Sequence, residues 1–217
     1  MDAPYATQEL MEFGADLREG LDQLFRWRRD VRRFLTDPVC PDLVARLLAQ
    51  ADLAPSVGLS QPWRWVSVED PARRAAIRAN FEAANRDALE SCEADRRETY
   101  ASLKLAGLDA APVHLAVFCD ETTDQGAGLG AATMPEMRRY SCVCAVFQLW
   151  LTARAHGLGL GWVSILDPDQ ATRDLDVPED WTLIAYLCLG YPQEDHEDPE
   201  LERAGWETRR TIPTLIR

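Results

Sequence analysis

Hydrophobic positions recur along the chain at two spacings, and these predict helices with a smaller number of strands between them. A first apolar stripe at helical spacing lies within residues 17–25, and a second spans 44–51 behind Pro41, a residue that suits the first turn of a helix. Residues 137–156 contain the most apolar helical segment. We expect this segment to be a central or an interface helix.

Four shorter apolar runs have the length of β-strands. They span residues 63–68, 113–119, 160–166 and 181–189. Asp167 and Pro168, after the third run, predict the cap and the first residue of a short helix. Strands interleaved with longer helices favour the α+β class, in which helices pack on a sheet around one core.

The remaining segments divide the single domain that we expect the whole chain to form. About residues 1–15 are predicted to be a loose N-terminal arm, and about residues 191–217 a C-terminal extension with an acidic first part. About residues 72–108 are helix-forming and heavily charged, which we interpret as a lid insertion of two helices with a break. Gly, Pro, Ser and Thr mark loops at 54–62 and 121–135.

The overall charge narrows the function classes. The chain has 23 Lys and Arg residues against 36 Asp and Glu, a net charge of −13 at pH 7. Such a field repels nucleic acid and anionic membranes, so a phosphate-bearing ligand needs a local basic pocket. The longest apolar run, residues 142–151, is too short to span a bilayer. The N-terminus lacks a signal-peptide pattern, and the six cysteines fit buried, reduced residues, so we expect a cytoplasmic protein.

Several familiar motifs lack the context that they need. Gly126–Ala131 fits the dinucleotide pattern G-x-G-x-x-A but does not directly follow a strand, so a flexible loop is the better interpretation. The three glycines within residues 157–161 miss that spacing, and we expect them to end a helix and let a ligand approach the backbone. His114, His156 and His196 show no ligand spacing, so no metal site is predicted.

An arginine segment, residues 28–34, is the strongest candidate for chemistry. Four of its seven residues are arginines, in a chain that is acidic overall. They form either a solvated basic face or a site that holds a phosphate. Asp30 lies among them, and it is either a local ion-pair partner or a group that transfers a proton.

Three segments, taken in order, resemble the flavin-dependent nitroreductase family. They read R-R-D-V-R-R-F from residue 28, A-P-S-V-G-L-S-Q-P-W from residue 54 and G-L-G-L-G-W-V-S-I-L-D-P from residue 157. The general family pattern has Ser, Asn and usually Gly where this chain has Asp30, Ser60 and Ser164. All three departures resemble one branch of the family, which fragments its flavin. The resemblance covers about residues 17–213.

The resemblance implies a fold and a site. The fold is an α+β sandwich with a central, mainly antiparallel sheet flanked by helices, in an intertwined homodimer with FMN at the interface. Residues carried over to the FMN site are Arg28, Arg29, Asp30, Val31, Arg32, Ser56, Gly58, Lys104, Trp162, Val163, Ser164 and Arg209. The first arginines and Arg209 would meet the phosphate and ribityl chain, although Arg210 matches nearly as well as Arg209. Lys104 matches the lid of the flavin-fragmenting branch.

The implied reaction is an O2-dependent fragmentation of reduced FMN to 5,6-dimethylbenzimidazole, the lower ligand of vitamin B12, and erythrose 4-phosphate. A separate NAD(P)H flavin reductase would supply the reduced FMN. Asp30 and Ser164 are the expected catalytic residues, and no metal takes part. Three alternatives stay open. They are an NAD(P)H-dependent FMN nitro or quinone reductase, a protein that only sequesters flavin, and a protein that handles a corrinoid.

Overall fold

The computed structural model describes residues 11–93, 95–102 and 106–216. Its helices are α1 (Ala15–Trp27), α2 (Pro41–Ala51), the 3-10 helix η1 (Val57–Leu59), α3 (Pro71–Ser91), α4 (Arg97–Ser102), α5 (Gly107–Ala110), α6 (Met137–Ala155), α7 (Pro168–Leu175) and α8 (Glu200–Arg203). Its strands are β1 (Trp63–Ser67), β2 (Val113–Asp120), β3 (Gly159–Val163) and β4 (Trp181–Gly190). The first ten residues of the expected N-terminal arm and Lys104 lie outside the described residues.

The four strands form one antiparallel sheet in the order β1-β2-β4-β3. The two central strands, β2 and β4, pair along nearly their whole length, with Leu115 opposite Leu187 and a register shift between Val117 and Phe118. The predicted α+β fold with a mainly antiparallel sheet is therefore confirmed.

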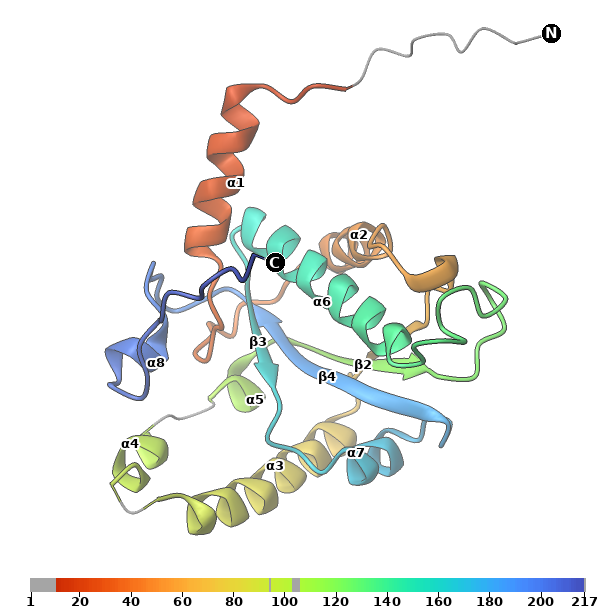
Figure 1. Ribbon diagram of the computed structural model, residues 1–217. Helices are drawn as coiled ribbons and strands as arrows, with labels where there is room; N and C mark the ends of the chain where they lie inside the picture. Colours follow the sequence, from red (N-terminus) through yellow and green to blue (C-terminus); the bar gives the residue numbers. More distant parts are fainter. Residues whose placement is uncertain (1–10, 94, 103–105, 217) are drawn as a thin grey trace, which may run out of the picture.

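Helices cover both faces of the sheet (Figure 1). The α2 and α6 helices lie over one face, and α3, α5 and α7 lie over the other. Successive side chains of β2 enter opposite cores, with Leu115 and Val117 in the first and Ala116 and Phe118 in the second. Because both faces are buried, this strand reads as a continuous apolar run rather than an alternating one.

The α6 helix is apolar on more than its core side. Leu149 is fully buried against the sheet, whereas Tyr140, Val143 and Phe147 remain 41–53% exposed. The α1 helix projects from the body of the molecule (Figure 1). None of its residues is buried, although it carries an apolar stripe. Large apolar side chains gathered on exposed helices are typical of an interaction surface. Residues 137–156 were expected to form a central or an interface helix, and this exposed apolar surface favours the second interpretation.

The structure corrects three details of the sequence interpretation. The predicted strand 160–166 ends at Val163, because Asn80 of α3 holds the backbone N–H and C=O of Asp167 at 2.8 and 2.9 Å and turns the chain toward α7. The charged insertion holds two helices with a break, α3 and α4, as expected, and a third short helix, α5, which was not expected, begins at its end. Not all cysteines are buried: Cys40 directly precedes α2 and Cys144 lies on α6, and both are exposed.

Candidate functional site

The arginine segment lies along the free edge of β3. The Val31 N–H donates to Leu160 O at 3.1 Å, and Asp30 pairs with Leu160 as an isolated parallel bridge. A Cβ atom at Gly161 would lie 2.2 Å from the Val31 carbonyl oxygen. Glycine is therefore required because two backbones meet there. The expectation that Gly159 and Gly161 admit a ligand is corrected: the group that they admit is Val31.

The third glycine behaves as predicted. Gly157 adopts a φ of +74° directly after α6, and the following Leu158 N–H donates to Ala153 O at 2.9 Å. This left-handed turn ends α6 and sends the chain into β3. The helix end and the glycine-rich strand therefore fix where the arginine segment can lie.

Asp30 is held in place from two sides. Its Oδ1 accepts a hydrogen bond from the Trp162 N–H at 2.9 Å, and its Oδ2 lies 3.5 Å from Arg32 Nε. Burial raises the pKa of the Asp30 carboxyl, while the Trp162 N–H and Arg32 oppose the rise and the Glu200 carboxylate adds to it. The side chain keeps 38% of its surface exposed in the single chain, so a substrate can reach it.

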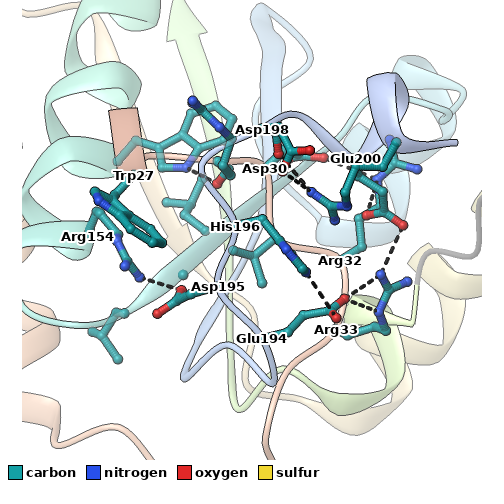
Figure 2. Close-up of a pocket in the computed structure, with 17 residues that line it drawn as sticks. Trp27, Asp30, Arg32, Arg33, Arg154, Glu194, Asp195, His196, Asp198 and Glu200 are labelled. Carbon is teal, nitrogen blue, oxygen red and sulfur yellow. Dashed lines mark hydrogen bonds and ion pairs between the residues drawn. The ribbon is translucent and has the colours of Figure 1, made fainter. Parts of the chain in front are cut away.

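Carboxylates of the C-terminal extension neutralise two of the arginines. Arg33 pairs with Glu194 at 2.6 Å and with Glu200 at 3.0 Å, and Arg32 lies 3.7 Å from Glu200 (Figure 2). His196 continues this network at 3.2 Å from Glu194. The network lines a cavity of about 40 Å³. Because that is space for only a few water molecules, this cavity is too small for a flavin.

A second cavity retains its positive charge. We call it the arginine cavity; it measures about 190 Å³ and is lined by Arg28, Arg29, Asp30, Arg32, Pro199, Glu200, Leu201 and Arg209. Burial and the charge of Arg209 both lower the pKa of Arg28. The pKa of Arg29 is lowered mainly by burial, and also by the charges of Arg28 and Arg209. Three guanidinium groups that repel one another favour an anion between them. The residues present thus fit a phosphate ester.

Two of these arginines are positioned by specific contacts. The Arg28 guanidinium lies over the Trp150 ring of α6, 4.8 Å from its centroid, and Arg29 Nε donates to Glu197 O at 2.6 Å. The structure also distinguishes Arg209 from Arg210, the two C-terminal arginines considered for the phosphate. Arg209 lines the arginine cavity, whereas Arg210 lies 3.5 Å from Glu207.

The three predicted site residues at the end of β3, Trp162, Val163 and Ser164, differ in their surroundings. Trp162 is half-buried, with its ring centroid 6.4 Å from that of Trp150, and its backbone N–H binds Asp30. Val163 is buried in the second core. Ser164 follows the end of β3 and is exposed.

Ser56 and Gly58 lie away from the arginine segment in the folded chain. Their loop contacts the first turns of α6, where the Val57 N–H donates to Ser141 Oγ at 3.0 Å. Arg28 contacts Trp150, nine residues further along the same helix. At a rise of about 1.5 Å per residue this separates the two regions by roughly 14 Å along α6. One chain therefore does not bring this loop to the arginine segment.

The sequence interpretation missed the residues that anchor the arginines. Glu194 and Glu200 belong to an acidic extension to which no role was assigned, and Trp150 lies within the most apolar helix. The sequence did offer one signal: the acidic run in the C-terminal extension could supply partners for the four arginines near the N-terminus. It specifies no pairing, because the partners are more than 160 positions apart.

None of the helices in the described part of the chain combines the length and hydropathy needed to cross a lipid bilayer. Within residues 11–93, 95–102 and 106–216, no group of three or more His, Cys, Asp or Glu side chains is placed to hold a metal ion.

The fold and the site define a nitroreductase-type protein. The sequence profile of the Nitroreductase family matches residues 25–191, and the chain belongs to this family. A 5,6-dimethylbenzimidazole synthase from Rhodospirillum rubrum is 59% identical over 205 residues, which cover 94% of this chain and 97% of the relative. A 5,6-dimethylbenzimidazole synthase from Rhodobacter capsulatus is 46% identical over 204 residues, covering 94% and 98%.

A solved structure shares the architecture. Oxidized iodotyrosine deiodinase bound to FMN and 3-iodo-L-tyrosine superposes with a TM-score of 0.71 at 24% identity, over 91% of this chain and 97% of that chain. At that identity the likeness shows a common fold.

Proposed function

We propose that this chain is a 5,6-dimethylbenzimidazole synthase, which fragments reduced FMN with O2 into 5,6-dimethylbenzimidazole and erythrose 4-phosphate. The observation that carries the proposal is Asp30, which stands where the general family pattern has Ser and borders the arginine cavity. The two synthase relatives support it through their identity over nearly the whole chain.

The phosphate of FMN binds in the arginine cavity. Arg28, Arg29 and Arg209 provide the charge, and Arg32 lies between Asp30 and Glu200, so that it orients the Asp30 carboxyl. Val31 fixes the segment on β3 through its backbone. These contacts hold the ester end of the ligand in the arginine cavity, and Asp30, at the border of that cavity and hydrogen-bonded to the Trp162 N–H, faces the part of the ligand that extends along β3.

The rest of the flavin extends along β3 and toward a second subunit. Sites that enclose a whole cofactor usually measure roughly 300–1,000 Å³, so a cavity of about 190 Å³ accommodates only part of FMN. Trp162 and Ser164 line the ring in our proposal, and Val163 between them anchors β3 in the second core. Ser56 of the partner subunit and Gly58 of the partner subunit complete the site in a homodimer, because one chain keeps that loop away from the arginines.

Reduced FMN, when bound, supplies the electrons that O2 accepts and the carbon atoms of the benzimidazole. Asp30 holds or moves a proton at the junction of ribityl chain and ring, and burial, which raises the pKa of its carboxyl, favours the protonated form that can donate. The Ser164 hydroxyl donates a hydrogen bond that orients the ring. The lid insertion, about residues 72–108 with Lys104, excludes bulk water from the site.

Reduced FMN comes from a separate NAD(P)H flavin reductase in this proposal. The six cysteines are free thiols, which suits a reducing compartment such as the cytoplasm.

The test combines the protein, FMN, a flavin reductase, NAD(P)H and air, followed by chromatography and mass measurement of the products. We expect 5,6-dimethylbenzimidazole only when the protein is present. Asp30→Asn and Ser164→Gly should each keep FMN binding within about threefold, and Asp30→Asn should lower product formation at least about 100-fold, the usual contribution of a proton-transfer group. The exposed Asp37→Asn is the matched control.

Two results would contradict the proposal. Full product formation by both variants would remove Asp30 and Ser164 from the chemistry. Absence of benzimidazole, together with direct NAD(P)H oxidation by the protein and a nitro compound, would instead establish a reductase with retained FMN.

A further inference from the structure

The last helix and the loop after it form one connected unit. After α8, Gly205 adopts a φ of +71° and the Trp206 N–H donates to Leu201 O at 2.8 Å. The Glu202 carboxylate accepts a hydrogen bond from the Arg209 N–H at 2.7 Å. These bonds fix Trp206 and Arg209 relative to each other on one short segment.

One end of this unit rests on the arginine segment. Glu200, the first residue of α8, accepts from Arg33 at 3.0 Å and lies 3.7 Å from Arg32. The Arg209 side chain lines the arginine cavity and raises the positive charge felt by Arg28. The position of the unit and the charge in the cavity are therefore linked.

The other end of the unit contacts the lid insertion. The Arg96 guanidinium lies over the Trp206 ring, with its Cζ 5.2 Å from the ring centroid. The Tyr100 ring packs against the same indole, with the two centroids 6.1 Å apart and the ring planes at 53°. The Tyr100 hydroxyl donates to Asn85 Oδ1 of α3 at 3.0 Å. Trp206 is half-buried by these contacts. It therefore joins α4 to the segment that carries Arg209.

We propose that Trp206 is a positioning residue that couples the lid helix α4 to the arginine cavity, so that a phosphate ester bound there holds α4 against the C-terminal extension. The inference rests on the proposed function, because the phosphate ester is that of FMN. Trp206 lines neither cavity of the site and acts through Arg209.

The coupling has a simple electrostatic origin. Without an anion, Arg209 is repelled by Arg28 and Arg29, which opposes the seating of the C-terminal unit. A phosphate removes that repulsion and attracts Arg209, and Trp206 moves with Arg209 because Glu202 ties their segment together. A ligand that binds the seated state better shifts the population toward it. Docking of α4 on Trp206 is then favoured by the phosphate, not by the flavin ring.

The test measures the opening of α4 by limited proteolysis of the full chain with endoproteinase Glu-C. Glu93 and Glu98 flank Arg96 and are exposed, and exposed Glu12 near the N-terminus is the internal reference. Cleavage rates at these sites are measured with no ligand, with saturating FMN and with saturating riboflavin, which lacks the phosphate. When opening is fast relative to cleavage, the rate reports the open population.

In the unsubstituted protein we expect FMN to slow cleavage at Glu93 and Glu98 about tenfold, and riboflavin less than about threefold. Trp206→Ala should still bind FMN, measured by quenching of flavin fluorescence, but FMN should then protect α4 less than about threefold. Arg96→Ala should weaken protection in the same direction. Trp206→Phe, which keeps a ring, should restore it, and Arg97→Ala on the same helix is the matched control.

Equal protection by FMN in Trp206→Ala and in the unsubstituted protein would overturn the inference, as would equal protection by riboflavin and FMN. Failure of the proposed function has a different signature. In that case the unsubstituted protein would bind no FMN or would form no benzimidazole, whatever happens at α4.

Discussion

At the scale of single residues, the chemistry that we propose for this protein depends on how Asp30 is surrounded. Burial favours the protonated carboxyl, whereas the Trp162 N–H and Arg32 favour the carboxylate. Glu200 also favours the protonated Asp30 carboxyl, because it adds negative charge nearby and lies close to the same Arg32 side chain. A serine at this position would feel none of these effects, since its hydroxyl does not ionise in the working pH range.

The raised pKa of Asp30 makes stability depend on pH. The folded state binds the Asp30 proton more tightly than the unfolded state, so its stabilising effect is complete below about pH 4 and is lost as the pH rises to the folded pKa. Asp30→Asn lacks this loss and still offers an oxygen to the Trp162 N–H. We therefore expect its free energy of unfolding, relative to the unsubstituted protein, to increase from pH 4 upward and then level off.

Urea unfolding of the flavin-free proteins at a series of pH values measures that difference. A constant difference across the range would show that burial does not raise the pKa of Asp30. Asp37→Asn, at an exposed position, should show no such rise.

At the scale of elements, the site is built by one packing event, the docking of the arginine segment on β3. Gly159 and Gly161 leave a groove for Val31, and the parallel bridge at Leu160 then fixes Asp30 opposite the Trp162 N–H. The strand is short because Asn80 turns the chain at Asp167. Ser164 is thereby left exposed at the end of β3, beside the half-buried Trp162.

Gly161→Ala should therefore damage the site and the fold together. Its Cβ would meet the Val31 carbonyl oxygen at 2.2 Å, and neither backbone can move without breaking the Val31–Leu160 hydrogen bond. We expect a loss of about 1–3 kcal/mol in the free energy of unfolding and at least about tenfold weaker FMN binding. Gly20→Ala is the control, because a Cβ there meets nothing within 4 Å and should stabilise α1 by about 0.5–1 kcal/mol. Unchanged FMN binding in Gly161→Ala would contradict this role of the glycine.

At the scale of the whole molecule, the single chain leaves apolar helix surface uncovered and keeps two parts of the proposed site apart. The α1 helix buries none of its residues, and α6 exposes an apolar stripe along its outer side. The loop that carries Ser56 and the segment that carries Arg28 contact opposite ends of that helix. A two-fold dimer through α6 would cover the stripe and could bring the loop of one chain to the arginines of the other.

Phe147→Glu should test the dimer. Phe147 is 45% exposed on α6, and in a two-fold interface each substitution acts twice. Losing the burial of two Phe side chains costs about 3–6 kcal/mol per dimer, so we expect at least about 100-fold weaker association and a parallel loss of FMN affinity. Sedimentation velocity and flavin fluorescence measure the two effects. Ala83→Glu, exposed on α3 at the opposite face of the sheet, should change neither, and a Phe147→Glu dimer that still binds FMN would exclude this interface.

Most elements of the fold were predictable because their signals are local. The apolar run at 113–119 and the Asp167-Pro168 cap both led to the observed elements. The end of the strand at Val163 was not predictable, since it depends on Asn80, 87 positions away from Asp167. The α5 helix at the end of the insertion was not predicted, because its four residues are too few for a periodic pattern.

The amino-acid sequence by itself determined the class of fold and the placement of four arginines around Asp30 in one segment, because residue type and spacing along the chain encode them. Only the tertiary structure decided which arginines share a cavity and which are neutralised. Arg33 meets Glu194 and Glu200 across 161 and 167 positions, and such pairings arise when the sheet and helices pack. Charges attract through space rather than along the chain, so the balance of charge at the site is a property of the folded molecule.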